Sequence, residues 1–293
     1  MKPATPPLWT WAVSASLAAS ILLWLAFDPA GQANQVEDLN LGRLDHAQAS
    51  GAPVVAIIGT SRAKCAIESD FTAAGRLAAQ GVKVRVVRIT QDSAVFADLK
   101  PAFEKLMRER PAVVLIEGDL FLFHRDQLPA PELKSWRARA ARAIRIRTGV
   151  RGLLANDPRG GNRPCPTETA ATGPAAVDLY KSGWDRQQPS SAADRTRYLN
   201  AMKRLKAHGA QVAIIRIPTS PMAQQLIPDR LSGPARQILA DLQGKNGETV
   251  LAIPDQPPQA AYADLGHMNA QGQQLYMAWL APQIAALVRS HHD

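Results

Sequence analysis

The chain has 293 residues, of which 46% are hydrophobic and 20% are charged, and its net charge is +9 at pH 7. This composition is ordinary for a folded protein, and the length left after a leader, about 260 residues, is sufficient for one large α/β domain. The positive charge favours anionic surroundings, such as a membrane surface, an acidic polysaccharide or a nucleic acid. Two cysteines, Cys65 and Cys165, form no CxxC pair and have no metal-ligand spacing, which argues against a cysteine-based metal site.

An apolar run lies near the amino terminus. Residues 8–27 are 20 residues without a charge, long enough for a helix that crosses a bilayer. Lys2 precedes the run and Asp28 follows it, so the positive-inside rule places the rest of the chain outside the cytoplasm. We expect an uncleaved anchor; the alternative is a cleaved signal peptide, with the small residues Gly31 and Ala33 at its cleavage site. Both alternatives send the body of the protein across the membrane.

Buried strands alternate with helical patterns along the rest of the chain. The apolar run at residues 54–58 is typical of a strand covered on both faces, as in parallel sheets. The predicted strands are 54–58, 82–89, 112–116, 210–217 and 249–253, and the predicted helices are 62–80, 94–110, 192–208, 233–242 and 270–289. This alternation predicts right-handed βαβ crossovers. We therefore expect an α/β fold, a flavodoxin-like three-layer α/β/α domain with a five-stranded parallel sheet, preceded by one transmembrane helix.

The domain organisation follows from these patterns. Residues 1–30 are the predicted membrane anchor, residues 31–52 a polar linker with one short helix at 37–48, and residues 53–293 the α/β domain. An irregular excursion near residues 128–195 interrupts the domain, and its stretch at 155–191 is expected to be irregular because Gly, Pro, Asn and Ser are frequent there. Such long loops are more often functional or mobile than inert.

Lysine and arginine residues are concentrated at residues 131–151. In a helix these arginines would not all share one face. Three interpretations remain open: a solvated basic face, a basic surface near anionic lipid and a nucleic-acid-binding helix. The last requires a cytoplasmic body, and with the body outside the cytoplasm we expect no nucleic-acid partner.

A serine follows the first predicted strand. Gly59, Thr60 and Ser61 form a tight turn at the carboxyl end of that strand, the edge at which open α/β sheets bind ligands. Ser61 is either a nucleophile or the N-cap of the next helix, because serine is a favoured N-cap residue. Its position alone leaves both interpretations open.

A second constellation precedes the last predicted helix. Asp264 stands three residues before His267 in a loop near the carboxyl edge of the sheet. A carboxylate at this spacing can accept the proton of one ring nitrogen, which fixes the tautomer and leaves the other nitrogen to act as a base toward a serine hydroxyl. The alternative is an incidental loop histidine.

Together the two constellations resemble a known family. A GTSR turn after the first strand and a DxxHxNxxG motif that begins at Asp264 are similar to the SGNH (GDSL-like) hydrolases. The resemblance covers residues 54–123 and 210–287. It is closest to the membrane-anchored extracytoplasmic branch, which often accompanies membrane-bound O-acyltransferases in modifying exported polysaccharide.

The resemblance implies acyl transfer through a serine ester. It makes Ser61 the nucleophile, His267 the base and Asp264 the acid that orients the base. Asn269 would brace the His267 loop or cap the last helix. This chemistry needs no metal and no cofactor.

The resemblance also implies three donors for the oxyanion. The backbone N–H of Ser61 would be the first, and the place of the second falls near Thr90. Asp119 occupies the place of the third, an asparagine in the family, and an ionised aspartate would repel the developing charge. Asp119 would serve only if protonated, or it would instead bind a helix terminus or position Arg62. Arg62 would bind an anionic group of the substrate or take part in an ion pair.

In an oxidising compartment, Cys65 and Cys165 can form a disulfide. The bond would tether the excursion over the catalytic edge and close a loop of about 100 residues, which the loop-entropy model values at roughly 4–5 kcal/mol. The alternative is one buried thiol and one loop thiol without a bond.

The expected function is that of an extracytoplasmic serine esterase or O-acyltransferase that acts on acyl esters, acetyl esters first among them, of a cell-envelope or exported polysaccharide. The expected location is the bacterial inner membrane, with the body in the periplasm. The expected partners are the acylated glycan and a membrane-bound O-acyltransferase. The alternative is a non-catalytic accessory protein of the same fold that binds the glycan or the acyltransferase.

Overall fold

The computed structural model describes residues 41–92, 94–125, 165, 173–185 and 187–292, together with positions 16, 17 and 20. From residue 41 onward these residues belong to one unit, Val36–Asp126 with Asn162–Asp293. The predicted anchor at 1–30, apart from those three positions, and the basic stretch at 131–151 lie outside the described residues. Within the described part of the chain, no helix is both long enough and apolar enough to cross a bilayer.

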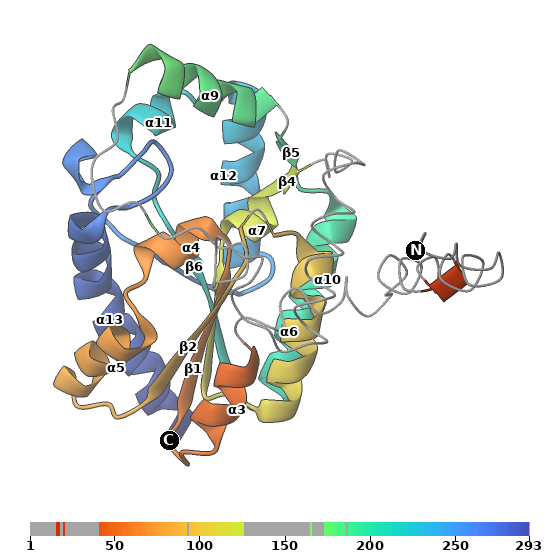
Figure 1. Ribbon diagram of the computed structural model, residues 1–293, viewed down its shortest axis with the longest axis vertical. Helices are drawn as coiled ribbons and strands as arrows, with labels where there is room; N and C mark the ends of the chain where they lie inside the picture. The colour runs from red at the N-terminus through yellow and green to blue at the C-terminus, as the bar shows by residue number, and fades with distance from the viewer. Residues whose placement is uncertain are drawn as a thin grey trace, which may run out of the picture. The chain divides into compact units, whose positions relative to one another are not determined.

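A five-stranded parallel sheet forms the centre of the described unit (Figure 1). In spatial order the strands are β2 Arg85–Thr90, β1 Val54–Gly59, β3 Val113–Glu117, β6 Gln211–Arg216 and β7 Thr249–Ala252. β1 and β3 are buried along their whole length, which is why both read as apolar runs in the sequence. Counted along the chain, the strand order is 2-1-3-4-5, that of flavodoxin-like doubly wound folds. The predicted five-stranded parallel sheet is confirmed.

Helices cover both faces of the sheet, because successive side chains of a strand point to opposite faces. Ile57, Leu115 and Ile215 pack in a core with α4 Ser61–Ala66, α5 Asp70–Ala79 and α13 Ala270–His292. The opposite face packs against α3 Gly42–Gln48, α6 Phe96–Glu109, α10 Ala192–Ala207 and α12 Asp229–Gln243. Figure 1 shows α5 and α13 on one side of the sheet and α6 and α10 on the other. Two short elements, α11 Pro221–Gln225 and the single turn η2 Gln259–Ala261, lie in the connections after β6 and β7.

The prediction of one helix over residues 62–80 is wrong, because two helices occupy that range. α4 ends at Ala66, and Ile67 takes an extended conformation with φ −99° and ψ 128°. α5 begins after Ser69, whose Oγ accepts the N–H of Thr72 at 3.1 Å as an N-cap. The apolar pattern runs across the break because Ile67 is buried like its helical neighbours, which hides the break in the sequence.

The second half of the predicted linker at 31–52 contributes to the core. α3 buries Leu44 and Ala47 against the α6 side of the sheet, and Leu41 just before it is also buried. Apolar residues three positions apart give this short helix its buried face.

The described part of the excursion near 128–195 has regular structure, so the expectation of an irregular segment is wrong there. It contains α9 Pro174–Asp185 and β5 Gln187–Pro189. β5 pairs antiparallel with β4 Phe123–Arg125, which follows α7 Asp119–Leu122. Arg230 of α12 donates hydrogen bonds to the carbonyl oxygens of Trp184 and Gln187, both at 2.7 Å. These contacts attach α9 to the domain beyond the carboxyl ends of the strands, at the top of Figure 1.

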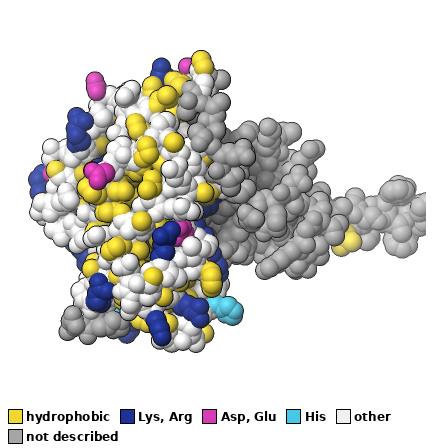
Figure 2. All heavy atoms as spheres, turned by 90° about the vertical axis from the view of Figure 1, so that its left-hand side faces the viewer, with side chains coloured by type: hydrophobic (Ala, Val, Ile, Leu, Met, Phe, Trp, Pro, Cys, Tyr) yellow, Lys and Arg dark blue, Asp and Glu magenta, His cyan; other side chains and the backbone are white. Residues whose placement is uncertain are grey.

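Figure 2 shows the face formed by the elements on the left of Figure 1, among them α5 and α13. Apolar side chains gather in its upper middle part, and Lys and Arg side chains are spread around them. α5 and α13 pack against each other, and each turns one large apolar side chain outward, Phe71 at 89% exposure and Leu275 at 42%. Positive charge is therefore distributed over this face and not concentrated at one point.

Candidate active site

Ser61, Asp264 and His267 lie together at the carboxyl end of the sheet. Ser61 is the first residue of α4, directly after β1, and the other two belong to the loop before α13. The Oγ of Ser61 is 2.9 Å from Nε2 of His267. On the other side of the ring, Nδ1 of His267 is 2.8 Å from Oδ2 and 3.0 Å from Oδ1 of Asp264. The fold thus joins residues 206 positions apart in one chain of hydrogen bonds.

Thr60 is the N-cap of α4. Its Oγ1 accepts the N–H of Arg62 at 3.3 Å, and Ser61 occupies the first helical position. The interpretation of Ser61 as the helix cap is therefore wrong. Because Thr60 already provides the cap, the Ser61 hydroxyl is available for its contact with His267.

Asp264 holds both the ring and the backbone of its loop. Its Oδ1 accepts the N–H groups of Gly266 and His267, both at 2.7 Å. Burial by itself would raise the pKa of Asp264, but the hydrogen bond and charge of His267, together with the two backbone N–H groups, outweigh burial and lower the pKa. Asp264 is therefore ionised at neutral pH and can hold a proton on Nδ1 of His267.

The loop that carries His267 is held by hydrogen bonds among its own residues and those next to it. The N–H of Ala263 donates to the carbonyl of His267 at 2.8 Å, and the N–H of Asn269 donates to the carbonyl of Ala261 at 3.1 Å. The Asn269 side chain donates to the carbonyl of Ala260 at 2.7 Å and accepts the N–H of Gly272 at 3.0 Å. Asn269 therefore both braces the loop and caps α13, the two roles that the sequence suggested for it.

Gly272 permits this close packing. A Cβ at this position would lie 2.0 Å from the carbonyl oxygen of Ala261, so any other residue would force the helix and the loop apart. The segment from Asp264 to Gly272 thus contains the carboxylate that contacts the His267 ring, the ring itself, the Asn269 brace and the glycine at which α13 meets the loop.

Glu117 supports the turn that carries the serine, and sequence reasoning missed it. It is the last residue of β3 and is fully buried. Its Oε2 accepts the N–H of Thr60 at 2.6 Å and that of Ala63 at 3.3 Å, while Oε1 accepts the Thr60 hydroxyl at 2.9 Å. A charged residue at the end of an otherwise apolar strand was the available signal, because such residues are buried only when paired or hydrogen-bonded.

The backbone N–H groups of the Ser61 turn differ in their hydrogen bonding. The N–H groups of Thr60, Arg62 and Ala63 all have acceptors, whereas the Ser61 N–H has none among the described residues. A free backbone donor beside a reacting hydroxyl is the usual first element of an oxyanion hole.

Thr90 is less well placed than the sequence suggested. It is buried at the end of β2 and pairs with Gly59. The N–H of Arg85 donates to the carbonyl of Pro53, and the N–H of Gln91 donates to the carbonyl of Gly59. Because the N–H groups of successive strand residues point to opposite sides, the N–H of Thr90 points away from β1.

Asp119 binds Arg62. The two side chains form an ion pair between Asp119 Oδ2 and Arg62 Nη1, and Nη2 of Arg62 donates to the carbonyl of Ile217. Both side chains are mostly buried, at 14% exposure for Arg62 and 23% for Asp119. Of the roles suggested for Asp119, the structure shows the positioning of Arg62 and not donation to an oxyanion. Arg62 correspondingly takes part in an ion pair.

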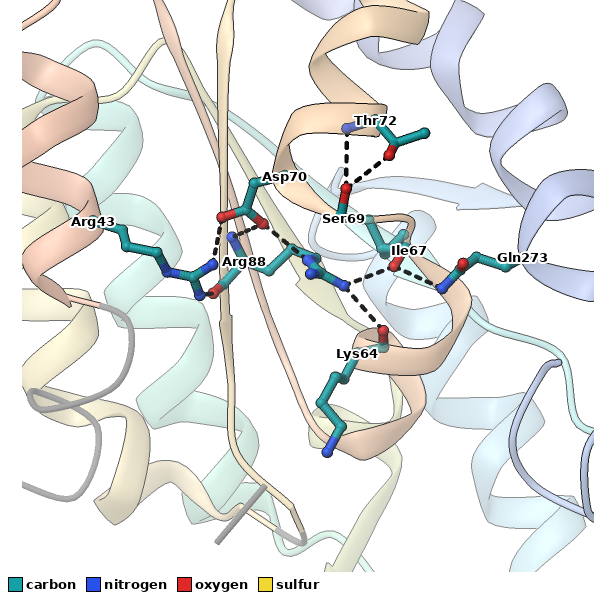
Figure 3. Close-up of polar contacts among 8 residues, drawn as sticks. All are labelled: Arg43, Lys64, Ile67, Ser69, Asp70, Thr72, Arg88 and Gln273. Carbon is teal, nitrogen blue, oxygen red and sulfur yellow. Dashed lines mark hydrogen bonds and ion pairs between the residues drawn. The ribbon is translucent and has the colours of Figure 1, made fainter. Parts of the chain in front are cut away.

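The far end of α4 is held by two other elements, as Figure 3 shows. Arg88 of β2 donates to the carbonyls of Lys64 and Ile67 at 3.2 and 2.9 Å. Gln273 of α13 donates to the carbonyls of Cys65 and Ile67 at 3.2 and 3.0 Å. These bonds satisfy carbonyl groups that the end of the helix leaves without intrahelical partners.

Arg88 is itself fixed by charged neighbours. Its Nε donates to Oδ1 of Asp70 at 2.9 Å, and Oδ2 of Asp70 accepts from Arg43 at 2.6 Å (Figure 3). Arg43 also donates to the carbonyl of Arg88 at 2.9 Å. The serine helix is therefore supported at both ends by side chains from elsewhere in the fold.

The excursion reaches the site at two points. A disulfide joins Cys65 of α4 to Cys165. Tyr180 of α9 lies against the loop that carries His267, because a Cβ built at Gly266 would be 3.6 Å from Cε2 of Tyr180. Burial raises the pKa of Tyr180 to about 12, so its hydroxyl is protonated at neutral pH.

The arrangement offers nucleophilic chemistry. A hydroxyl bonded to one imidazole nitrogen, with a carboxylate on the other, is the geometry of a serine nucleophile with its general base. No cluster of His, Cys, Asp and Glu within the described part of the chain could hold a metal ion.

Similarity to known proteins is low. No family model matches the chain, and no curated protein matches it. Among solved structures, the chain is similar to the crystal structure of TesA, with 15% sequence identity and a TM-score of 0.41 over 80% of this chain and 99% of TesA. The roles of the site residues therefore rest on the geometry of this chain.

Proposed function

We propose that the chain is a serine esterase or O-acyltransferase of the SGNH type. One observation carries the proposal: Ser61, His267 and Asp264 form a continuous hydrogen-bonded chain, with 2.9 Å from Ser61 to His267 and 2.8 Å from His267 to Asp264. This geometry supports the roles that the sequence suggested for the three residues.

The mechanism follows from the order of these contacts, Ser61 to His267 to Asp264. The Oγ of Ser61 attacks an ester carbonyl while Nε2 of His267 takes its proton, and Asp264 stabilises the imidazolium that forms. The N–H of Ser61 faces the developing oxyanion. His267 then returns the proton to the leaving alcohol, which departs as the acyl-enzyme forms. Water or a sugar hydroxyl, deprotonated by His267, attacks the acyl-enzyme and restores Ser61.

We further propose that the substrate is an acylated, above all acetylated, glycan of the cell envelope, and that the body works outside the cytoplasm beside a membrane-bound acyltransferase. The uncharged run at 8–27 supports the location. The Cys65–Cys165 bond also supports it, because disulfides persist in oxidising compartments. The net charge of +9 suits an anionic polysaccharide.

A fluorophosphonate probe tests the nucleophile. The purified protein should be labelled and Ser61→Ala should not be, while Ser232→Ala, a serine of α12, should be labelled like the wild type. Labelling of Ser61→Ala at the wild-type level would contradict the assignment. A folded wild-type protein that is neither labelled nor active on acetyl esters would favour the accessory, glycan- or partner-binding alternative.

A further inference from the structure

Glu117 lies directly against the turn that carries Ser61. It touches no substrate in the mechanism above, yet it is fully buried. We propose that Glu117 is a positioning residue, which holds Thr60 and Ala63 so that the Ser61 hydroxyl stays aimed at His267. This inference rests on the proposed function, because the position of Ser61 matters most if Ser61 reacts.

Both oxygens of Glu117 are engaged on the turn. One accepts the N–H of Thr60 at 2.6 Å and the N–H of Ala63 at 3.3 Å, and the other accepts the Thr60 hydroxyl at 2.9 Å. The same hydroxyl accepts the N–H of Arg62 at 3.3 Å. The residues on both sides of Ser61 are thus tied, directly or through Thr60, to one side chain of β3.

Packing alone does not account for a carboxylate at this position. Burial of a charge is unfavourable unless hydrogen bonds compensate for it, so an apolar side chain would end the strand with less cost in free energy. The neighbouring residue makes room for the carboxylate: a Cβ on Gly59 would lie 2.5 Å from Oε2 of Glu117. Both Gly59 and Glu117 are therefore suited to the contact between the carboxylate and the turn.

The contacts divide the backbone donors of the turn into two groups. Thr60, Arg62 and Ala63 have acceptors, and Ser61 retains a free N–H among the described residues. Without Glu117, two more N–H groups would lose their acceptors, and the turn would move to satisfy them. Because the Ser61 N–H and hydroxyl act on the transition state, the loss should lower kcat and leave KM nearly unchanged.

Two substitutions of Glu117 separate the effect of its hydrogen bonds from the effect of its size. Glu117→Leu removes both acceptors at similar size. Glu117→Gln keeps one oxygen for the N–H groups of Thr60 and Ala63 and turns its amide toward the Thr60 hydroxyl. For hydrolysis of p-nitrophenyl acetate by the full-length protein, we expect Glu117→Leu to lower kcat about 100-fold, the size of a lost oxyanion donor. Glu117→Gln should restore kcat to within about tenfold of the wild type, because the acceptor geometry decides the effect.

A matched control separates positioning from stability. Glu68 is also buried, at 5% exposure, but it pairs with Arg76 and does not bind the serine turn. Glu68→Leu should lower Tm as Glu117→Leu does while kcat stays near the wild-type value.

Where Glu117→Leu fails to fold, Thr60→Val removes only the hydroxyl that links Glu117 to Arg62. It should lower kcat about tenfold, and Thr60→Ser should restore it.

Crystal structures of the variants decide the inference independently of activity. In the positioning model the Ser61 Oγ leaves hydrogen-bond distance of His267 Nε2 in Glu117→Leu or Thr60→Val, from 2.9 Å in the wild type. An unchanged distance together with wild-type kcat would overturn it. A wild-type protein that hydrolyses no ester and binds no probe would overturn the proposed function instead, and the distances would still test the positioning.

Discussion

The turn that carries Ser61 and the loop that carries His267 are held in different ways. The Ser61 turn and α4 depend on distant parts of the chain, with Glu117 from β3, Arg88 from β2 and Gln273 from α13. The His267 loop depends mainly on residues of its own segment, above all Asp264 and Asn269, with one bond from the N–H of Ser220 to the carbonyl of Leu265 at 3.2 Å. The first is anchored in the core, whereas the side chains of the second are partly exposed, at 29% for His267 and 42% for Asp264.

This difference shows how the two partners of the proposed reaction divide the structural requirements. The base needs a defined tautomer and ring orientation, and a carboxylate three residues away supplies both. The nucleophile needs a fixed hydroxyl and a free backbone donor, which only the surrounding fold can arrange. The site therefore combines a locally encoded half with a half that depends on tertiary structure.

The largest effect should come from the local half. Asp264→Asn leaves the shape of the loop almost unchanged but offers an amide to Nδ1, which favours the wrong tautomer of His267, so kcat for p-nitrophenyl acetate should fall about 10⁴-fold. Asp255→Asn, at an exposed loop position, is the control and should behave like the wild type. A loss of less than about tenfold in Asp264→Asn would mean that the ring is held by something other than its neighbour in the chain.

A smaller effect tests whether both halves depend on close backbone contact. A Cβ at Gly59 would meet Ala63 at 2.4 Å, and one at Gly272 would meet the carbonyl of Ala261 at 2.0 Å. Gly59→Ala and Gly272→Ala should each reduce the free energy of unfolding by about 1–3 kcal/mol in urea titrations.

Gly75 in α5 is the matched control for these glycines, because a Cβ there would have nothing within 4 Å. Gly75→Ala should stabilise the protein by about 0.5–1 kcal/mol through its helix propensity. If Gly59→Ala were as stable as Gly75→Ala, the turn would be looser than its contacts with Glu117 indicate.

The smallest effect is a dependence of stability on pH that originates in the His267 loop. The pKa of Asp264 is lowered in the folded protein from its ordinary value of 3.8. Folding therefore favours the ionised form, and the resulting stability is present above that value and is lost as pH falls through the lowered pKa. The difference in unfolding free energy between the wild type and Asp264→Asn should shrink between pH 6 and pH 3, at about room temperature in urea. A difference that grew on acidification would contradict the direction of the shift.

The difference between local contacts and contacts with distant parts of the chain also explains what could be predicted from the sequence. The buried runs at 54–58 and 112–116 predicted the centre of the sheet, because strands covered on both faces are apolar throughout. Asp264 and His267 were found because their spacing is local. Glu117 was missed, because its partners are 57 and 54 positions away and no short-range pattern marks them. The break between α4 and α5 was missed because Ile67 continues the apolar pattern through an extended residue.

The disulfide has a consequence for the biogenesis of the molecule. Cys165 follows Cys65 by 100 positions, and a chain emerges from the ribosome amino terminus first. Residues 54–117, which contain Ser61, Arg88 and Glu117, are therefore complete before the second thiol exists. Arg88 and Glu117 can therefore contact α4 and its turn before the disulfide forms, whereas Gln273, the third support, follows Cys165 in the chain. Covalent closure therefore needs the chain at least as far as Cys165, and the redox state of the compartment decides what fraction of the molecules completes it.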